Sequence, residues 1–286
     1  MESLDSEGGP PTTMSYKMIV LDMDDTLLTS DHTISPKTKE ALLDAQARGY
    51  KVVLASGRPT FAMWDAAREL ELAKYGSYIL SFNGASVIDC ATNEEIFSST
   101  LQPDTVAHLH DISEREGIAI HTYVGNEIVT DRPNPYTDIE GELTGMPVVH
   151  VGDFKEAVTA PVVKCLMLAD GDTLAPIETK LQEELAGKLA VARSKPFFLE
   201  FTEAGVTKGT SLAFLAAQLG IAQKEVIACG DGNNDLTMIE WAGLGVAMGN
   251  ANTTVKGKAD FITKSNNEDG IAHVIETYMA DVIVTQ

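Results

Sequence analysis

Long apolar runs are absent from this sequence of 286 residues. No stretch approaches the roughly 18 apolar residues that a membrane span needs. The first fifteen residues also lack the basic and apolar regions of a signal peptide. These absences predict a cytoplasmic protein without a membrane partner. Residues 1–15 are polar and contain glycine and proline, which predicts a flexible N-terminal extension outside the fold.

Cysteine and histidine are also scarce. The three cysteines, Cys90, Cys165 and Cys229, are odd in number and show no paired spacing, which excludes a disulfide scaffold and favours a reducing compartment. None has a histidine close by in the sequence, so we interpret them as small buried residues rather than catalytic thiols. The six histidines, among them His110 and His121, show no zinc-ligand spacing, and no zinc site is predicted.

Basic residues are few. The sequence has 21 Lys and Arg residues and 42 Asp and Glu residues, which gives a formal charge of −21. Such a surface repels nucleic acid and anionic lipid, so neither is predicted as a partner. Hydrophobic residues make up 44% of the chain and charged residues 22%, which is ordinary globular usage. An acidic protein that handles phosphate must gather positive charge locally, from a metal ion, a few basic side chains and helix N-termini.

Short apolar runs alternate with helix-like segments along the chain. An apolar run at 18–21 ends in acidic residues and is followed by helical spacing at 35–48, which opens with Ser-Pro. The same unit returns as a strand at 51–55 and a helix at about 60–72, and a third strand is predicted at 78–82. This alternation predicts a doubly wound parallel α/β sheet, whose ligands lie outside the carboxyl ends of its strands.

The middle of the chain has a different pattern, which predicts an inserted α/β domain at 87–195. We expect this domain to contain two strands around a Gly-Asn turn within 117–131, a strand at 162–168 and a helix at 176–186. Strand-helix units then resume, with predicted elements at 207–219, 226–229, 236–242 and 245–248. The catalytic core is therefore expected to comprise 16–86 and 196–286.

An acidic cluster follows the first predicted strand. Asp22, Asp24 and Asp25 lie within DMDDT, and three carboxylates so close together repel one another unless a cation or a proton compensates them. Oxygen ligands of this kind suit Mg²⁺, which takes one or two carboxylates and leaves positions for water and substrate phosphate. An N-cap or a solvated loop is the alternative interpretation of this fragment alone.

A second acidic loop follows the buried strand at 226–229. The sequence GDGNND supplies Asp231, Asn234 and Asp235, and its two glycines let the backbone turn tightly beside a ligand. If the two strands are neighbours, Asp231 is expected to face the Asp22 cluster. An ordinary turn explains this loop in isolation, but two acidic loops at strand ends favour a shared site.

Other polar residues also follow predicted strands or begin a helix. Ser56 and the backbone of Gly57 lie in ASGR, where a hydroxyl and N–H groups can bind phosphate oxygens, and Arg58 is expected to hold either a local carboxylate or a substrate. Asn83 ends the third strand. Lys208 begins a helix, where the dipole disfavours a cation unless it points at anions. A turn or a solvated surface position is the alternative for each.

In their order along the chain, DMDDT, ASGR, VTKG and GDGNND resemble the four motifs of the haloacid dehalogenase-like (HAD) hydrolase superfamily. Together with FNGA and an α/β insertion between Ser56 and Lys208, they resemble its Cof-type sugar-phosphatase subgroup, which has a large mobile cap of type IIB. The resemblance covers about residue 17 to the C-terminus. It departs from the family at Asp25, where many relatives carry glycine.

This resemblance implies a phosphoric monoester hydrolase in which Asp22 attacks phosphorus and forms an aspartyl-phosphate. Asp24 would protonate the leaving oxygen and then activate water. Magnesium would be held by the Asp22 carboxylate, the Asp24 backbone carbonyl and Asp231, with Asp235 in support. Phosphate and substrate would be bound by Ser56, Gly57, Arg58, Asn83, Lys208 and Asn234.

The partner expected from this resemblance is a small phosphorylated metabolite, bound by a monomer or a homodimer. The cap would close over the site, exclude water and select the leaving group. A phosphomutase would use the same nucleophile and acid and is the main alternative. A receiver-type signalling module also pairs a phospho-accepting Asp with Mg²⁺ and Lys, but the length of the chain, its insertion and its second acidic loop disfavour it. A catalytically idle binding regulator would be expected to have lost Asp22, Asp24 or Asp231.

Overall fold

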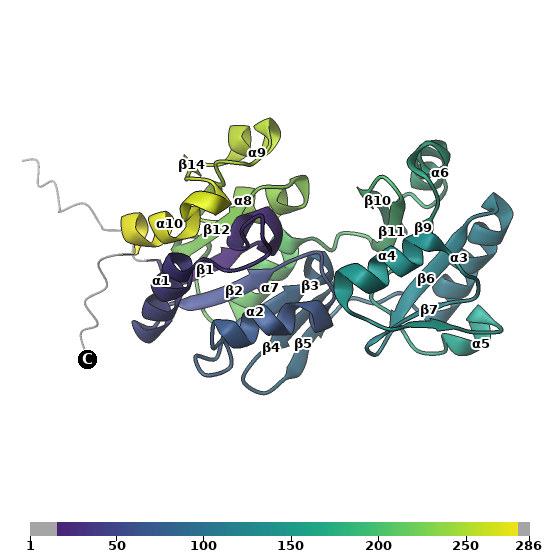
Figure 1. The fold of residues 1–286 in the computed structure, drawn as a ribbon, viewed down its shortest axis with the longest axis horizontal. Helices are drawn as coiled ribbons and strands as arrows, with labels where there is room; N and C mark the ends of the chain where they lie inside the picture. The colour runs from purple at the N-terminus through teal and green to yellow at the C-terminus, as the bar shows by residue number, and fades with distance from the viewer. Residues whose placement is uncertain (1–15, 280–286) are drawn as a thin grey trace, which may run out of the picture.

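The computed structural model describes residues 16–279. The chain forms two β-sheets, one with eight strands and one with six, and helices pack against both. Figure 1 shows the two sheets in separate halves of the molecule, which we call the core and the cap. The predicted α/β class with a parallel sheet is confirmed. The predicted flexible extension at 1–15 lies outside the described residues.

The core sheet has the strand order β14-β13-β12-β1-β2-β3-β4-β5. Pairing is parallel from β14 to β3, whereas β4 and β5 form an antiparallel edge. The strand bounds are β1 Met18–Leu21, β2 Lys51–Ala55, β3 Tyr78–Ser81, β4 Ser86–Asp89, β5 Glu94–Ser98, β12 Val226–Gly230, β13 Leu244–Ala247 and β14 Phe261–Ile262. Because β1 lies between β12 and β2, the loops that follow these three strands meet at one edge of the sheet.

Helices cover both faces of the core sheet. Leu42, Leu70 and Ile275 belong to the apolar cluster on one face, and Leu212 and Leu215 to the cluster on the other. The helix bounds are α1 Pro36–Ala47, α2 Trp64–Glu69, α7 Lys208–Gln218, α8 Leu236–Trp241, α9 Thr253–Lys258 and α10 Gly270–Tyr278. Strands covered on both faces read as continuous apolar runs, which explains why the sequence pattern predicted them.

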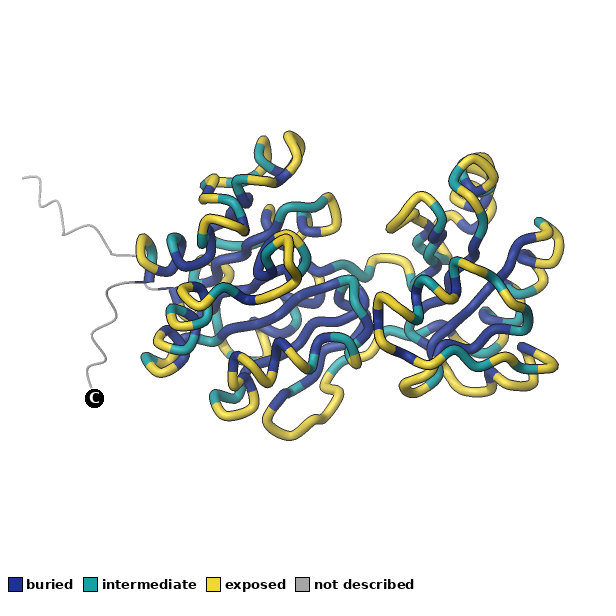
Figure 2. The backbone as a smooth tube through the Cα atoms, viewed as in Figure 1, coloured by how far each residue is buried: buried dark blue, intermediate teal, exposed yellow. Residues whose placement is uncertain are grey.

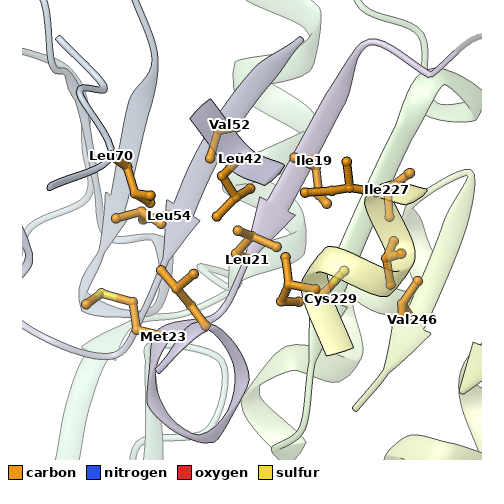
Figure 3. Close-up of a cluster of buried hydrophobic side chains, with 14 of the residues drawn as sticks. Ile19, Leu21, Met23, Leu42, Val52, Leu54, Leu70, Ile227, Cys229 and Val246 are labelled. Carbon is orange, nitrogen blue, oxygen red and sulfur yellow. The ribbon is translucent and has the colours of Figure 1, made fainter. Parts of the chain in front are cut away.

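The central strands are buried along nearly their whole length, the first residue of β2 being partly exposed. Figure 2 shows them as buried backbone, while exposed residues gather in the loops and on the outer sides of the helices. Figure 3 shows Ile19, Leu21, Leu54 and Ile227 packed together with Cys229 between the sheet and its helices. Each buried Leu or Ile side chain contributes about 1.5–3 kcal/mol to folding. These contacts hold the strand ends, and therefore the loops after them, in fixed positions.

The cap sheet has the strand order β10-β11-β9-β6-β7-β8. Its strands are β6 Ala119–Val124, β7 Glu127–Thr130, β8 Val148–His150, β9 Cys165–Leu168, β10 Leu189–Lys195 and β11 Phe198–Glu203. Its helices are α3 Pro103–Glu116, α4 Pro135–Thr144, α5 Phe154–Ala157 and α6 Gly171–Glu184. One face of this sheet packs on α3 and α6. On the other face, a second apolar cluster joins α4 residues to Phe82 and Ala85 of the core.

Strand pairing divides the chain at different residues from the predicted 87 and 195. Strands β4 and β5, at 86–98, hydrogen-bond to β3 and so extend the core sheet. Strand β11, at 198–203, pairs with β9 and β10 of the cap sheet. Both predicted domain boundaries therefore lie too close to the N-terminus. A short hairpin and a single strand carry no sequence signal for the sheet that they will join, because that choice depends on distant partners.

Two predicted elements within the cap also start elsewhere. The helix predicted at 176–186 begins earlier, at Gly171, because the Asp170 side chain accepts hydrogen bonds from Asp172 N and Thr173 N and caps the helix there. Pro176 lies inside this helix instead of opening it. The strand predicted at 162–168 begins at Cys165. Within residues 16–279, no helix has both the length and the apolar character needed to cross a membrane.

The three cysteines are buried and free, as their apolar surroundings predicted. Burial raises the pKa of the Cys90 and Cys165 thiols to about 12. Burial also raises the pKa of Cys229. These groups therefore remain neutral thiols near pH 7 and act as packing residues rather than nucleophiles.

Candidate active site

Carboxylates from two neighbouring strands converge at the carboxyl edge of the core sheet. Leu21, the last residue of β1, is paired with Cys229 of β12, which puts the loops after these strands side by side. One carboxylate oxygen from each of Asp22, Asp231 and Asp235 lies within 4.8 Å of the others. The sequence predicted this meeting on the condition that the two strands are neighbours, and the sheet order satisfies the condition.

The turn after β1 has an unusual backbone that directs its polar groups. Residues Met23–Leu27 form a tight turn in which Asp25 has φ of 58°, a left-handed conformation that few residues other than glycine, asparagine and aspartate adopt. Asn250 supports it, because its Nδ2 donates to the Asp25 carbonyl (2.7 Å). Thr26 Oγ1 donates to Asp231 Oδ1 (3.0 Å) and so links the two acidic loops.

Lys208 is the buried cation of this site. Thr207 caps helix α7, so that Lys208 occupies its first turn with no exposed surface. Its Nζ donates to Asp22 Oδ1 (2.5 Å) and to Asp235 Oδ1 (2.6 Å). Burial alone lowers the pKa of Lys208, but the two carboxylates outweigh that effect and raise it overall, so the ammonium stays charged. The expectation that this lysine points at anions from an unfavourable helix position agrees with the geometry.

Negative charge nevertheless exceeds positive charge at this point. Burial, followed by repulsion from Asp235, raises the pKa of Asp22 well above its usual value despite the contact with Lys208. Burial likewise raises the pKa of Asp231 to about 6, and Asp235 adds to the increase. A site that disfavours its own ionised carboxylates is suited to a further cation.

The donor set fits a hard divalent cation. Asp22 and Asp231 each use one carboxylate oxygen in a hydrogen bond to the protein, and their other oxygens accept none from the described part of the chain. Asp235 has a different position, because its Oδ2 accepts hydrogen bonds from the backbone N–H groups of Asp231 (3.0 Å) and Gly232 (2.9 Å). Asp22 and Asp231 are therefore the available oxygen ligands, and Asp235 fixes the loop that carries one of them.

Gly230 permits this arrangement. A Cβ atom at position 230 would collide with the side chain of Asp235. The glycine thus lets the Asp235 carboxylate fold back against the backbone of its own loop, where it orders the residues on either side of Asp231.

Asp24 and Arg58 form a separate ion pair. Arg58 Nε donates to Asp24 Oδ2 (2.8 Å) and Nη2 donates to Oδ1 (2.5 Å), which is a bidentate contact. Burial raises the pKa of the Asp24 carboxyl, but Arg58 more than offsets this effect, and the pKa is lowered overall. Of the two partners predicted for Arg58, the structure shows the local carboxylate. Its predicted contact with substrate stays a prediction.

The remaining predicted residues line the loops after β2 and β3. Ser56 is buried, and its Oγ accepts a hydrogen bond from the backbone of Arg58 (3.2 Å). Asn83 N donates to the Ser56 carbonyl (2.9 Å), and Asn83 Oδ1 accepts from Asn234 Nδ2 (3.1 Å). A Cβ on Gly57 would lie 3.2 Å from the Asn83 side chain, so Gly57 allows this close approach. These residues meet one another beside the carboxylate cluster.

Two residues of the site were not identified from the sequence. Thr26 links Asp231 to the first loop, and Asn250 holds the Asp25 carbonyl. A signal existed for Asn250, because it comes shortly after strand β13 and a polar residue beyond a strand end is expected at the ligand edge. Thr26 lies within DMDDT itself, and only the fold shows that its hydroxyl points at Asp231.

Comparisons with known proteins agree with this architecture. A family model described as haloacid dehalogenase-like hydrolase matches residues 19–275. A solved haloacid dehalogenase-like hydrolase from Bacteroides thetaiotaomicron is 43% identical, with a TM-score of 0.87, and the match covers 92% of this chain and 99% of that chain. The structure of the HAD subclass IIB sugar phosphatase BT4131 is 27% identical with a TM-score of 0.78, covering 93% of this chain and 100% of that chain.

A relative with a named reaction is similar over nearly its whole length. The 5-amino-6-(5-phospho-D-ribitylamino)uracil phosphatase YcsE from Bacillus subtilis strain 168 is 30% identical over 269 residues, which is 93% of this chain and 97% of the relative. A parallel α/β core with an acidic edge and a separate α/β cap defines a class of capped hydrolases. The chain belongs to the haloacid dehalogenase-like hydrolase family, in its Cof-type branch. The predicted enzyme class, a phosphoric monoester hydrolase, is confirmed at this level.

Proposed function

We propose that this protein is a Mg²⁺-dependent phosphatase that hydrolyses small phosphorylated metabolites, such as sugar phosphates or phosphorylated cofactors, through an aspartyl-phosphate at Asp22. The observation that carries the proposal is the convergence of Asp22, Asp231 and Asp235 around the buried Lys208. Relatives named as a sugar phosphatase and as a ribitylaminouracil phosphatase support this range of substrates.

The first step would be attack by the Asp22 carboxylate on the phosphorus atom of the substrate. The bond from phosphorus to the leaving oxygen breaks, and Asp24 supplies the proton that converts this oxygen to a hydroxyl. Lys208 holds Asp22 in place and neutralises part of the charge around it. Ser56, Asn83 and Asn234 contribute polar groups beside the transferred phosphoryl group.

In the second step, Asp24 would take a proton from water as the water attacks the phosphorus atom of the aspartyl-phosphate. The bond between Asp22 and phosphorus breaks, which releases inorganic phosphate and regenerates the carboxylate. An aspartate nucleophile suits hydrolysis because the mixed anhydride that it forms is labile to water. Arg58 favours the ionised form of Asp24 that this step requires.

The first step requires the opposite protonation state of Asp24. Since Arg58 lowers the pKa of this carboxyl, Asp24 must gain its proton as the substrate binds and the contact with Arg58 loosens. Release of Arg58 would leave burial as the main influence, and burial raises the pKa of Asp24. Asp24 would thus act as an acid when its contact with Arg58 is released, and as a base when the contact is formed.

Magnesium would be held by the Asp22 and Asp231 carboxylates together with the Asp24 backbone carbonyl. When bound, such an ion offsets the repulsion between the carboxylates and the incoming phosphate and so supplies electrostatic stabilisation. Its oxygen donors are of the type that Mg²⁺ prefers.

Phosphate release from a panel of sugar phosphates, phosphorylated cofactors and nucleotides, with and without Mg²⁺, tests the proposal. Asp22→Asn is expected to abolish release. Asp24→Asn is expected to lower turnover by about 10²–10⁴, the usual contribution of general acid-base catalysis. The exposed Asp104 of α3 offers a matched control, since Asp104→Asn removes a carboxylate far from the loops of the site.

Activity in Asp24→Asn close to that of the native protein would contradict the assigned acid and base. Conversion of a sugar phosphate to an isomer without free phosphate would identify a phosphomutase instead. Release that does not depend on Mg²⁺ would contradict the metal assignment alone.

A further inference from the structure

The β10–β11 hairpin of the cap carries an exposed lysine at its tip. Lys195 ends β10 and pairs with Phe198, and the strand register shifts between Arg193 and Lys195. Such irregularities redirect side chains and recur beside active sites. The next residues anchor the tip to α4, because the Phe197 ring stacks on Tyr136 with centroids 5.0 Å apart. Figure 1 shows β10 and β11 on the side of the cap that is turned towards the core.

Lys195 lies within electrostatic reach of carboxylates from both halves of the molecule. Burial raises the pKa of Asp24 in the core, Arg58 outweighs this effect, and Lys195 adds to the lowering. In the cap, burial raises the pKa of Glu140 on α4, while Lys164, Tyr123 and Lys195 act in the opposite direction. Lys195 therefore lies near a carboxylate of the core edge and a carboxylate of α4.

His32 also lies close enough to Asp24 to lower its pKa. The other lysine and arginine side chains around Asp24 and Glu140 are already engaged by carboxylates. Lys208 donates to Asp22 and Asp235, and Arg58 donates to Asp24. Lys164 is buried and its Nζ donates to Glu200 Oε1 (2.9 Å). The Lys195 side chain makes neither a hydrogen bond nor an ion pair with any residue in 16–279. In a chain with a formal charge of −21, a basic side chain left uncompensated beside the reaction site is an unusual feature.

We propose that Lys195 recognises a second negative charge, a carboxylate or a phosphoryl group, on the leaving group of the substrate. This inference rests on the proposed phosphatase function. Asp24 is the group that protonates the leaving oxygen, so a cation near Asp24 on the cap lies on the leaving-group side of the bond that breaks. The transferred phosphoryl group has its own partners in the core loops. Lys195 is therefore free to select among leaving groups.

Two matched pairs of substrates test this role. Glucose 6-phosphate and 6-phosphogluconate differ by a carboxylate, and fructose 6-phosphate and fructose 1,6-bisphosphate differ by a phosphoryl group. The native enzyme is expected to favour the more charged member of at least one pair by about tenfold in kcat/KM, the effect of one charge-assisted contact. Lys195→Met is expected to reduce that ratio to about one, mainly by raising KM for the charged member, whereas Lys195→Arg retains it.

Lys188, an exposed lysine before β10 in the same cap, provides the control. Lys188→Met is expected to leave the ratio unchanged, because loss of one positive charge at a distance has little effect on a contact-based preference. The preference should also weaken as salt is added. A native enzyme that does not favour the more charged member of either pair, or a ratio that survives in Lys195→Met, overturns the proposal. The pair that shows the preference identifies the anion.

Binding separates this inference from the proposed reaction. Asp22→Asn lacks the nucleophile, so calorimetry can measure its affinity for 6-phosphogluconate and fructose 1,6-bisphosphate without turnover. Addition of Lys195→Met to this variant is expected to weaken binding of the preferred compound about tenfold. Selective binding that depends on Lys195, without phosphate release by the native protein, would contradict the phosphatase and support the anion site. Phosphate release by the native protein, with no contribution of Lys195 to binding, would support the phosphatase and contradict the anion site.

Discussion

Lys208 supplies one positive charge to a cluster of three carboxylates, Asp22, Asp231 and Asp235. When all three are ionised, two negative charges remain uncompensated, and this balance matches the charge of one divalent cation. The pKa of Asp231 is raised to about 6 by burial and by repulsion from Asp235, which agrees with an excess of negative charge in the cluster. Stability and metal binding should therefore be coupled at this cluster.

Asp231→Asn is expected to separate the two effects. In the native protein, Mg²⁺ at about a hundred times its dissociation constant should add about 2.7 kcal/mol to the free energy of unfolding. In Asp231→Asn, most of this gain should vanish, while the metal-free variant is at least as stable as the metal-free native protein because a repulsive charge is gone. Urea unfolding with and without Mg²⁺ measures both quantities. An undiminished response to Mg²⁺ would rule out Asp231 as a ligand.

Sequence reasoning at this scale identified residues better than it identified their partners. Asp22 and Asp231 were expected together because polar residues after neighbouring parallel strands share one edge of the sheet. For Arg58, the sequence left two partners open, a local carboxylate or a substrate. The contact with Asp24 could not be predicted, because the partner of a long side chain depends on which groups the fold brings close to it. Asn250 binds the carbonyl of a residue that precedes it by most of the chain, and no local pattern predicts such a pair.

At the scale of elements, the turn between β3 and β4, which carries Asn83, packs against helix α7. Gly84 has φ of +97°, and Ser211 Oγ of α7 donates to its carbonyl (2.6 Å). A Cβ at position 84 would lie 2.6 Å from the Thr207 carbonyl and 2.7 Å from Ser211 Oγ. The turn and the start of α7 therefore fit together only with glycine at this position, and Lys208 begins that same helix.

Gly84→Ala is expected to lower the free energy of unfolding by about 1–3 kcal/mol, because it combines left-handed backbone strain with a collision. Turnover should fall as well, since relief of the collision displaces the helix that carries Lys208. Gly117→Ala is the control, for Gly117 also has positive φ (+69°) but has nothing within 4 Å of an added Cβ. Urea unfolding and phosphate release measure the two effects. Equal costs in the two variants would contradict the packing argument.

Strand β6 and helix α4 enclose a histidine that should make the cap sensitive to acid. His121 is fully buried, its Nδ1 lies 3.2 Å from Thr137 Oγ1, and its Nε2 has no partner among the described residues. Burial, followed by repulsion from Lys164, lowers the pKa of His121 to about 3, whereas in the unfolded chain it is about 6.5. Between these values the unfolded chain binds more protons, so the contribution of His121 to stability is complete above pH 6.5 and is lost as the pH falls.

His121→Gln removes this titration. Its free energy of unfolding should depend less on pH between 6.5 and 4, by up to about 1.4 kcal/mol per pH unit, the value for one proton. Urea unfolding at several pH values provides the measurement. His150 ends β8 and is exposed, so His150→Gln should leave the native slope intact. Identical slopes in His121→Gln and the native protein would show that His121 takes up its proton without unfolding.

The elements that the sequence predicted best are those whose burial is complete. Strands β1 and β12 are buried along their whole length, and β2 is buried after Lys51; their bounds agree closely with the apolar runs. Residues 87–98 were assigned to the inserted domain, although they form strands of the core sheet, because β5 is largely exposed and belongs to the edge of that sheet. The start of α6 was predicted too late in the sequence, because proline is common in the first turn of a helix and Pro176 was taken as that turn. The N-cap is Asp170.

At the scale of the whole molecule, the chain crosses between the two sheets twice. The first crossing lies between β5 and the bridge that pairs Leu101 with Val162, and the second lies between Glu203 and the N-cap Thr207. The halves also meet at the cluster around Phe82, where Lys164 of the cap lies 5.8 Å from the centre of the Phe82 ring. Two short connections permit relative movement of the halves.

Closure of the cap should make the molecule more compact. The radius of gyration measured by small-angle X-ray scattering is expected to fall when Mg²⁺ and orthovanadate, a mimic of the transferred phosphoryl group, are added together. Binding in a closed site excludes water and brings the cap groups to the substrate. Asp22→Asn with the same additions serves as the control, because it lacks the group that vanadate would contact. An unchanged radius in the native protein would contradict a closing cap.

The pairing of β1 with β12 also governs the order in which the chain can fold during its synthesis. Met18 pairs with Val226, so the central ladder of the core forms only after most of the chain has left the ribosome. The cap is contiguous in sequence and all of its strand partners are translated before that point. Domains fold as units during synthesis, and distant pairings form late. The cap should therefore acquire its structure before the carboxyl edge of the core sheet does.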